Sequence, residues 1–442
     1  MNDPTGTPAE GRTSRRRFLE ATATVAGLSI ARSAHAAGDE TIKIALIGCG
    51  GRGTGAAAEA LSTKGPVKLV AMADVFKDRL ERSLKYLSEG GIIPAVDAAR
   101  LTDHIDVPPE RRFVGFDAYR KAIDCGVDLV LLTTPPVFRP AHYEAAVKAG
   151  KHVFMEKPCA VDAPGVRSLL ASNEIAKKKG LAVGVGLQRR HQNSYLELVK
   201  KIHDGVVGKV MLVRTYFNMS GTVDGPKPRP DATEMEHQLR HYAWFNWLSG
   251  DHFHDQGVHT IDVANWVMQG YPVKANGMGG REVCVGPWSG DVFDHDFVEF
   301  EYADGTRYYA QARQIPGAWQ YVGEHVTGDK GELTLGVGPY GGTRQPGYEG
   351  NNPFQQEQDD LLASIRAGKP LFEGDFGAMS SMTGILGRMA LYSGQMVTWD
   401  QAIKSNKGLL PQKLAMDAKP PVLPDKDGFY SPLPMPGVTK PW

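Results

Sequence analysis

The sequence has few cysteines, no excess of charge of either sign and no apolar run long enough to cross a bilayer. Its four cysteines lie singly, which excludes both a disulfide framework and a zinc site of paired cysteines. Lys plus Arg and Asp plus Glu each number 50, so no net charge attracts nucleic acid or an anionic membrane. The 42% of apolar residues is typical of a folded protein, and 442 residues predict two or three domains.

The first 36 residues have the three parts of an export signal. Residues 14–19 read Ser-Arg-Arg-Arg-Phe-Leu, residues 21–31 are rich in alanine, and Ala34-His35-Ala36 fits a small-x-small cleavage site. The pattern resembles twin-arginine signals, with Glu20 where Lys is usual. We therefore expect a periplasmic or otherwise exported protein whose mature chain begins near Ala37 and has no membrane span.

Strand-like and helix-like segments alternate over residues 37–188. Apolar runs at 42–47, 67–73, 128–133, 152–155 and 181–185 are separated by helical patterns that begin near 54, 77, 139 and 163. Such alternation predicts a parallel sheet with helices on both faces. The N-terminal domain is therefore predicted to be an α/β Rossmann domain.

The rhythm changes after residue 188. Strands are predicted at 209–217, 273–277, 292–302, 307–314 and 321–326, and helices at 193–203, 255–268, 355–367 and 379–392. Clustered strands predict an α+β C-terminal domain with a large, mostly antiparallel sheet over residues 189–418. Residues 419–442, rich in Pro and Gly, are expected to form an arm on the surface or on a partner subunit.

The glycine-rich turn at residues 48–53 predicts a dinucleotide site. Gly48, Gly50 and Gly53 fit G-x-G-x-x-G between an apolar strand and a helix, where the free N–H groups and the helix dipole face a pyrophosphate. Asp74 ends the next strand and can bind both hydroxyls of the adenosine ribose, which favours NAD over NADP. The nearby Lys77 leaves NADP open.

Two later motifs resemble the Gfo/Idh/MocA oxidoreductase family. The first is Met155-Glu156-Lys157-Pro158, and the second is residues 255–262, which fit D-x-G-x-H-x-x-D. The resemblance covers roughly residues 42–392. It implies a nicotinamide-dependent enzyme that acts on a small molecule, and a homo-oligomer.

The chemistry of alcohol oxidation fits these motifs, since it needs a hydride acceptor and a base for the hydroxyl proton. On one continuous helix, Asp255 and His259 lie one turn apart and can share a proton. In the family, residues matching Lys157, Asp255 and His259 surround the reacting carbon. We assign His259 as general acid/base, Lys157 as the partner of the substrate hydroxyl, and Asp255 as an orienting group.

The resemblance also implies further contacts. The cofactor contacts expected beside the glycines and Asp74 are Gly51, Arg52, Thr133, Thr134, Pro135, His142, Glu156, Lys157, Gln188 and Arg189. Polar and aromatic residues that could line a sugar cleft are Arg190, Tyr195, Arg214, Tyr216, Trp244, Asn246, Trp247, His252 and His254. Core packing is the equal alternative for each member of the second set except His252 and His254, which are expected to be substrate contacts peculiar to a subgroup.

A metal site is the main alternative near His259. Asp251, His252, His254 and Asp255 precede it, and these residue types can bind zinc. We expect no metal, because Lys157 already accounts for the charge stabilisation that the chemistry requires.

Export constrains the function, because no pool of free NAD(H) is maintained outside the cytoplasm. We therefore expect an oxidoreductase of sugars or glycosides that holds its NAD tightly and restores it within each cycle. The first alternative is an NAD-dependent glycosidase that oxidises C3, eliminates the aglycone, adds water and reduces the product. A binding or structural protein without turnover is a third reading, which the intact Lys157, Asp255 and His259 disfavour.

Overall fold

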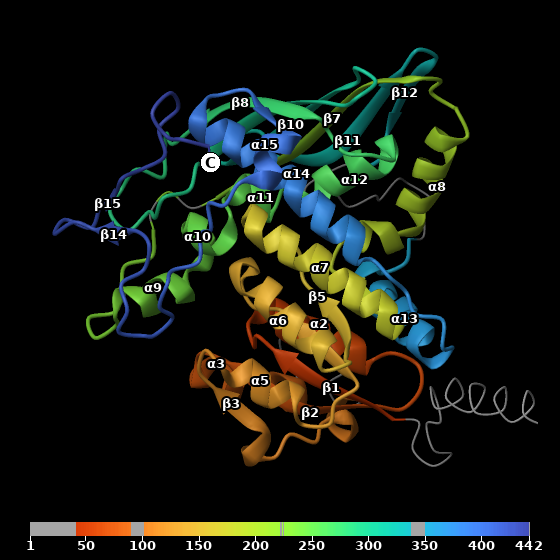
Figure 1. Ribbon diagram of the computed structural model, residues 1–442, viewed down its shortest axis with the longest axis vertical. Coiled ribbons are helices and arrows are strands. Elements are labelled where there is room, and N and C mark those ends of the chain that lie inside the picture. Colours follow the sequence, from red (N-terminus) through yellow and green to blue (C-terminus); the bar gives the residue numbers. More distant parts are fainter. Residues whose placement is uncertain (1–40, 90–100, 222, 224, 337–349, 442) are drawn as a thin grey trace, which may run out of the picture. The chain divides into compact units, whose positions relative to one another are not determined.

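The computed structural model describes residues 41–89, 101–221, 223, 225–336 and 350–441. The export signal expected over residues 1–36 lies outside the described residues. Residues 42–442 form one compact unit. Within it, one parallel and one mixed sheet are separated by layers of helices (Figure 1).

The first sheet has six parallel strands in the order β3-β2-β1-β4-β5-β6. Their bounds are β1 Ile42–Ile47, β2 Val67–Asp74, β3 Arg112–Val114, β4 Leu129–Leu132, β5 His152–Met155 and β6 Val183–Val185. All four residues of β4 are buried, because helices cover both faces of the sheet. The predicted Rossmann arrangement is confirmed.

Helices from distant parts of the chain cover this sheet. One face packs against α2 Gly51–Leu61, α3 Lys77–Glu89 and α13 Pro353–Arg366, and the other against α5 Ala118–Ile123 and α6 Arg139–Lys148. On that second side, α7 Ala163–Lys179 packs on α6. It begins where the Asp162 carboxylate accepts from Gly165 N–H and ends at Gly180 in the left-handed conformation, as predicted.

The second sheet has seven strands in the order β12-β11-β7-β10-β9-β8-β13. The bounds are β7 Val210–Met219, β8 Lys274–Gly280, β9 His295–Glu301, β10 Arg307–Gln314, β11 Tyr321–Gly328, β12 Gly331–Thr334 and β13 Val397–Thr398. Only β7 and β10 pair in parallel, so the predicted mostly antiparallel sheet is confirmed.

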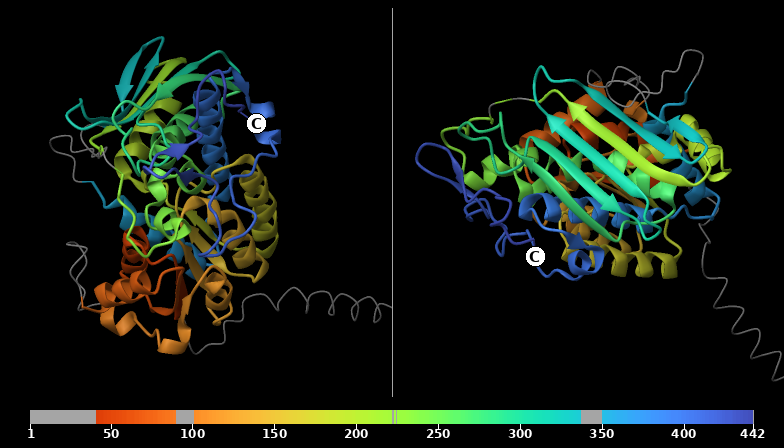
Figure 2. Two further views of the ribbon diagram at one scale, coloured as in Figure 1. Left: turned by 90° about the vertical axis from the view of Figure 1, so that its left-hand side faces the viewer. Right: turned by 90° about the horizontal axis from the view of Figure 1, so that it is seen from above.

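One face of this sheet packs on three helices, α11 His252–Asp255, α12 Val258–Met268 and α14 Gly374–Ser393. Its other face lies toward the viewer in Figure 2, right. The remaining elements are α8 Asn193–His203, α9 Glu234–Arg240, α10 Asn246–Ser249 and α15 Trp399–Lys404, and the 3-10 turns include η4 Gln188–His191 and η5 Tyr242–Trp244. No helix among the described residues is long and apolar enough to cross a membrane.

The predicted continuous helix over residues 255–268 is wrong. The chain forms two helices, and Asp255 ends α11 while His259 lies on α12. The break is at Gly257, where a Cβ would lie 2.1 Å from the carbonyl oxygen of Phe253. Gln256 and Gly257 form a turn between the two helices, and no hydrogen bond joins Asp255 and His259 among the described residues.

The C-terminal arm lies on the surface with most of its residues exposed, and a few of its residues pack into the protein. It contains a two-stranded ribbon of β14 Leu423–Pro424 and β15 Tyr430–Ser431. Val422 and Tyr430 are buried in an apolar cluster with Phe245, Trp247 and Leu239. The Pro-rich composition of the arm did not predict that these two apolar residues are buried.

We predict that the protein loses stability as the pH falls below about 6.5, the ordinary pKa of histidine. The Nε2–H of His254 donates to Ala160 O at 2.7 Å, and burial lowers the pKa of His254 to about 3. Between these two pKa values the unfolded chain binds a proton at this residue and the folded protein does not. The free energy of unfolding therefore falls by up to about 1.4 kcal/mol for each pH unit. Thermal unfolding measured from pH 7 to 4 checks this.

The matched pair for that measurement is His254→Gln and His203→Gln, because His203 is exposed. The first variant should flatten the dependence of the melting temperature on pH, and the second should leave it unchanged. An identical slope in both variants would contradict the assignment.

Candidate functional site

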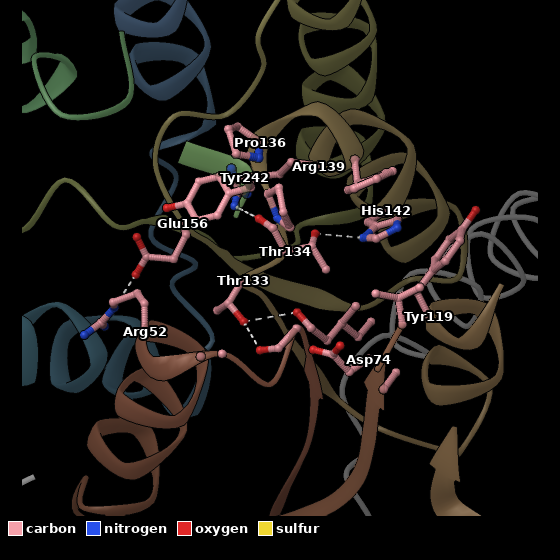
Figure 3. Close-up of a pocket in the computed structure, with 18 of the residues that line it drawn as sticks. Arg52, Asp74, Tyr119, Thr133, Thr134, Pro136, Arg139, His142, Glu156 and Tyr242 are labelled. Carbon is pink, nitrogen blue, oxygen red and sulfur yellow. Dashed lines mark hydrogen bonds and ion pairs between the residues drawn. The ribbon is translucent and has the colours of Figure 1, made fainter. Parts of the chain in front are cut away.

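A cavity lies at the carboxyl ends of the strands of the first sheet, and residues of both sequence halves line it (Figure 3). The glycine turn, Asp74, Thr133 and His142 form its Rossmann side. Lys157 and Asp255 both line it as well, so the cavity runs from the glycine turn to the second motif.

Two glycines of the turn are required by close packing, and two leave open space. A Cβ on Gly53 would lie 1.9 Å from Gly48 O, and one on Gly48, whose φ is +100°, would lie 2.6 Å from Thr134 N. By contrast, nothing lies within 4 Å of a Cβ built on Gly50 or Gly51. The turn is therefore tight on its protein side and open on the side where α2 begins.

Thr133 fixes the turn from the neighbouring strand. Its hydroxyl donates to the carbonyl oxygens of Ile47, at 3.1 Å, and Gly48, at 2.5 Å. The next residue, Thr134, contacts His142 Nδ1 through its hydroxyl at 3.2 Å. The end of β4 thus forms the floor of the cavity.

Asp74 is buried at the end of β2 and accepts from two backbone N–H groups. Its Oδ2 lies 2.7 Å from Cys49 N, and its Oδ1 lies 2.8 Å from Phe76 N. Burial raises the pKa of Asp74, while these two N–H groups oppose the rise. Each oxygen keeps a further lone pair, so the carboxylate can still accept from two ribose hydroxyls.

Lys77, the residue that left NADP open in the sequence, does not line the cavity. Lys77 is three-quarters exposed and pairs with Glu81 at the surface. Arg79 lines the cavity instead, and its guanidinium donates to Arg240 O at 2.7 Å.

His142 lies in an aromatic group at one side of the cavity. Its ring stacks on Tyr119 with centroids 4.1 Å apart and on Phe138 at 6.1 Å. Burial lowers the pKa of His142 to about 3, so the ring is neutral. A neutral, stacked imidazole suits the uncharged face of a bound heterocycle.

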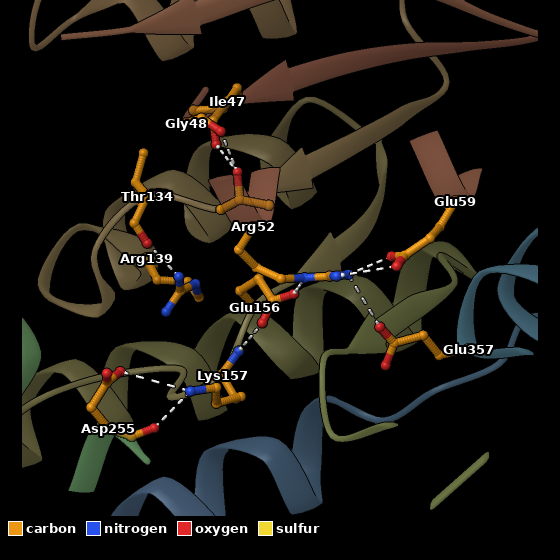
Figure 4. A network of polar contacts seen from close by, with 11 residues as sticks. Ile47, Gly48, Arg52, Glu59, Thr134, Arg139, Glu156, Lys157, Asp255 and Glu357 are labelled. Atoms are coloured by element: carbon orange, nitrogen blue, oxygen red, sulfur yellow. Dashed lines mark hydrogen bonds and ion pairs between the residues drawn. The ribbon is translucent and has the colours of Figure 1, made fainter. Parts of the chain in front are cut away.

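Arg52 ties the glycine turn to the predicted Glu156 (Figure 4). Its Nε lies 2.5 Å from Glu156 Oε1, and its Nη2 lies 2.6 Å from Glu59 and 3.6 Å from Glu357 of α13. Phe354 of the same helix lies under the guanidinium at 5.1 Å. Arg52 and Glu156 both line the cavity, and their pairing joins the turn to the end of β5.

Lys157 connects the two motifs. Its Nζ donates to Asp255 O at 2.7 Å and lies 3.9 Å from Asp255 Oδ1 (Figure 4). Both side chains are largely buried, at 13% and 6% exposed. Burial raises the pKa of Asp255, and the Lys157 ammonium opposes that rise. The ammonium and the carboxylate are therefore held together at one end of the cavity.

His259 lies near Lys157 without bonding Asp255, and it is not among the residues that line the cavity. Its ring stacks on Phe217 with centroids 6.4 Å apart, and its buried Nδ1 has no hydrogen-bond partner among the described residues. Burial, and then the charge of Lys157, hold the pKa of His259 well below its usual range. The imidazole is thus neutral and able to accept a proton. His252, against the same Phe217, also has a buried Nε2 without such a partner.

Several predicted contacts lie in other surroundings. Arg189 pairs with the buried Glu324, to which Tyr195 OH also donates at 2.9 Å. Arg190 forms two bonds to Asp262, at 2.8 and 2.9 Å. None of Arg189, Arg190 and Tyr195 is among the residues that line the cavity. Their charges and hydroxyl are engaged by the protein, so they act in packing.

Arg214 and Tyr216 of β7 point to the other face of the second sheet, away from α12. Arg214 pairs with Glu332 at 3.0 Å, and Tyr216 contacts Trp319 and Tyr321 edge-on. The alternation of side chains along a strand explains the difference, since Phe217 points to the opposite, His259 side.

The aromatic residues before α11 are also placed in packing. Trp247 is buried and its Nε1–H donates to Gln238 at 2.6 Å, and Trp244 lies against the same apolar cluster. The amide oxygen of Asn246 and that of Gln188 are buried without a hydrogen-bond partner in the described structure. Neither Asn246 nor Gln188 lines the cavity.

The metal alternative has no support in the geometry. Asp251 accepts from the N–H groups of Phe253 and Phe293 and from Tyr392 OH, and His254 donates to Ala160 O. Among the residues that the structure describes, no three His, Cys, Asp or Glu side chains are arranged to hold an ion.

The sequence analysis missed several cavity residues, among them Tyr119, Arg139, Leu239 and Tyr242. Arg139 is buried and donates to the carbonyls of Thr134 and Pro158. Arg139 follows Pro135-Pro136 just after the end of β4, and this position in the sequence could have predicted it as a cavity residue. Leu239 and Tyr242 gave no such signal, because they lie in a stretch without strand periodicity. The charge of Asp255 is the first cause that raises the pKa of Tyr242, so its phenol stays protonated near that carboxylate.

The cavity residues fit a dinucleotide. Gly50 and Gly51 leave room beside the N-terminus of α2 for a pyrophosphate, and Asp74 lies at the adjacent strand end for a ribose. A parallel sheet with this turn, joined to a second domain whose helices α11 and α12 carry Asp255 and His259, defines a two-domain oxidoreductase with a Rossmann cofactor domain.

Comparison with known proteins gives the family. Residues 42–187 match the model described as "Oxidoreductase family, NAD-binding Rossmann fold", and residues 195–334 match the GFO/IDH/MocA C-terminal domain. Together these two models cover well over half of the chain. The protein belongs to the Gfo/Idh/MocA oxidoreductase family, and its cofactor is NAD.

The relatives it matches include inositol dehydrogenases. The inositol 2-dehydrogenase of Rhizobium meliloti strain 1021 is 27% identical over 259 residues, 58% of this chain and 64% of that protein. The inositol 2-dehydrogenase/D-chiro-inositol 3-dehydrogenase of Halalkalibacterium halodurans is 27% identical over 210 residues, 45% of this chain and 51% of that protein. The chain thus spans about half to two thirds of the length of these relatives.

Solved structures share the fold. The scyllo-inositol dehydrogenase of Lactobacillus casei, with bound NAD(H) and scyllo-inositol, has a TM-score of 0.61 at 19% identity and covers 82% of this chain and 100% of its own. The aldose-aldose oxidoreductase of Caulobacter crescentus, complexed with glycerol, has a TM-score of 0.60 at 20% identity, with 81% and 100% covered.

We predict that Gly50→Ala and Gly53→Ala fail in different ways. The Gly53 variant forces a methyl group against Gly48 O, so it should lower the melting temperature as well as NAD affinity. The Gly50 variant has open space for its methyl group, so it should fold normally and lose NAD affinity alone. Calorimetric titration with NAD and thermal unfolding check both. Normal NAD affinity in the Gly50 variant would contradict the assigned pyrophosphate position.

Proposed function

We propose that this protein is an exported NAD-dependent oxidoreductase of sugars, polyols or glycosides whose cofactor stays bound and is restored within each cycle. The observation that carries the proposal is the Lys157–Asp255 pair at one end of the cofactor cavity, with the neutral His259 beside it. An ammonium next to a neutral imidazole suits a reaction that removes a hydroxyl proton.

Each group has a defined part in that reaction. The Lys157 ammonium donates a hydrogen bond to the substrate hydroxyl and stabilises negative charge on its oxygen as the proton leaves. His259 accepts the proton, and its lowered pKa leaves the imidazole unprotonated before the reaction. Asp255 holds Lys157 through its backbone carbonyl and its carboxylate, so we propose that it orients the lysine. When bound, NAD supplies the acceptor for the hydride.

Cyclic polyols and sugar rings are the substrates that this site suits. The relatives of R. meliloti and H. halodurans carry the names of inositol dehydrogenases, and an inositol and a sugar ring both present secondary hydroxyls on a six-membered frame. The buried ring nitrogens of His252 and His259, both beside Phe217, have no hydrogen-bond partner among the described residues, and we propose that a substrate hydroxyl supplies one.

Export and cofactor retention are proposed together. The twin-arginine pattern over residues 14–19 supports transport of a folded chain, which can carry NAD with it. A released cofactor would not be replaced outside the cytoplasm, so a second substrate must restore it in place. The protein is accordingly proposed to couple one oxidation to one reduction.

We also propose a homo-oligomer formed through the second sheet. On its face away from the helices, Trp319 is 60% exposed and stacks on Tyr321, and Met278 of β8 is 74% exposed. Light scattering on the purified protein checks this, and a monomer at micromolar concentration would contradict it.

The first test of the reaction uses the purified, exported protein without added cofactor. Denaturation should release about one NAD per chain. Incubation with a panel of inositols, sugars and glycosides, followed by mass spectrometry, should give a keto product together with a reduced partner. Absence of NAD, and of NAD binding on titration, would refute the proposal. Release of an aglycone without net oxidation would instead identify glycosidase chemistry.

The second test is substitution of the reacting groups. His259→Ala and Lys157→Ala should each lower turnover about 10²–10⁴-fold, the usual share of a positioned acid–base group, while NAD stays bound. Lys148→Ala is the matched control, because Lys148 is exposed and pairs only with Glu144. Single-turnover absorbance of NADH at 340 nm measures the chemical step directly. Unchanged rates in the His259 variant would remove it from the mechanism.

A further inference from the structure

One wall of the cofactor cavity comes from residues 234–244, here called the cover, which comprise α9 and η5. Leu239 and Tyr242 of the cover line the cavity together with Asp74 and the glycine turn. Tyr242 is drawn beside Glu156 and Arg139 in Figure 3. The cover belongs to the second half of the sequence, yet it faces the nucleotide-binding edge of the first sheet.

The cover is attached to the Rossmann side at the start of α3. Arg240 forms an ion pair with Asp78, with its two terminal nitrogens 3.0 and 3.1 Å from the carboxylate, and lies 3.9 Å over the ring of Phe76. In return, Arg79 donates to Arg240 O at 2.7 Å. These contacts lie within five residues of Asp74, so the cover is anchored next to the proposed ribose position.

The C-terminal arm holds the other side of the cover through polar contacts. Gln238 is fully buried and donates to Val422 O at 2.7 Å. Tyr430 OH donates to a Glu234 carboxylate oxygen at 2.7 Å. Both bonds join the arm to the short helix α9, which carries Leu239. Just before the arm, Met416 O accepts from Thr233, the residue that caps α9, at 2.6 Å.

Apolar packing supports the same contact. Tyr430 and Val422 are 5% and 7% exposed, and they share one cluster with Met235 and Leu239 of the cover and with Phe76 of the Rossmann side. Displacement of the cover would therefore expose apolar surface from three parts of the chain at once. The arm closes this cluster from outside.

We propose that the cover, held in place by the C-terminal arm, is the element that retains NAD between turnovers, with Leu239 and Tyr242 as its contacts to the cofactor. This inference rests on the proposed function, which requires a resident cofactor. A dinucleotide in the cavity would contact the cover along one wall, and in this proposal movement of the cover is the step that frees it. The rate of departure is then set by the contacts between cover and arm, which do not touch the cavity.

The experiment measures release of NAD rather than turnover. Holoprotein loaded with radiolabelled NAD is mixed with excess unlabelled NAD, and retained label is followed by rapid gel filtration. Tyr430→Ala removes a buried ring and a hydrogen bond outside the cavity and should raise the release rate about tenfold or more, since it favours the open cover. Tyr430→Phe keeps the ring and should give a smaller increase.

The matched control is Phe429→Ala, because Phe429 is the adjacent aromatic residue and is 45% exposed. It should release NAD at the wild-type rate. Limited proteolysis gives a second readout: cleavage within residues 234–244 should be faster in Tyr430→Ala than in Phe429→Ala. Equal release rates for Tyr430→Ala and the wild type would overturn the inference.

If Tyr430→Ala fails to fold, a second pair of variants, on the Rossmann side of the cover, tests the inference. Asp78→Ala removes the partner of Arg240, and Glu81→Ala on the same helix removes only an exposed pair with Lys77. The first should speed release and the second should not, and equal rates would overturn the inference. Rapid loss of NAD from the wild type would refute cofactor retention itself. Slow release that no cover variant changes would refute only the role of the cover.

Discussion

The contact between Lys157 and Asp255 is the interaction on which the site depends. It joins the end of a Rossmann strand to a helix of the second domain, with Nζ 2.7 Å from a carbonyl and 3.9 Å from a carboxylate oxygen. Removing one partner of such a largely buried pair leaves an uncompensated charge, at a cost of about 3–5 kcal/mol. The pair therefore aligns the two domains, and the charge of Lys157 adds to burial in lowering the pKa of His259.

The sequence predicted the fold where the local signals agreed with one another. Helix α7 has a capping Asp162, a proline in its first turn and Gly180 at its end, and its predicted bounds are those of the structure. The helix predicted over residues 255–268 was wrong because its apolar periodicity continues through Gly257. What ends α11 is the close approach of that glycine to Phe253, a packing constraint that no spacing of side chains encodes.

The site was predictable to the extent that its residues lie in motifs. The glycine turn, Asp74, Lys157 and Asp255 all line the cavity, as the strand order of a parallel sheet requires. Residues without a motif were assigned by type alone, and type does not distinguish a cleft from a core. Tyr195 and Trp247 are buried in packing, whereas Tyr242 reaches the cavity because the arm and α3 position its segment.

Helix α13 gives the first sheet a dependence on the far end of the chain. Leu361 and Leu362 pack in the cluster that contains Leu46 of β1, and Phe354 and Glu357 contact Arg52 of the glycine turn. The nucleotide-binding domain therefore depends on a helix from the C-terminal part of the chain. Because the chain is synthesised from the N-terminus, all six strands are complete well before residue 353 is made. The apolar surface of the sheet that α13 covers therefore stays exposed until the last fifth of translation.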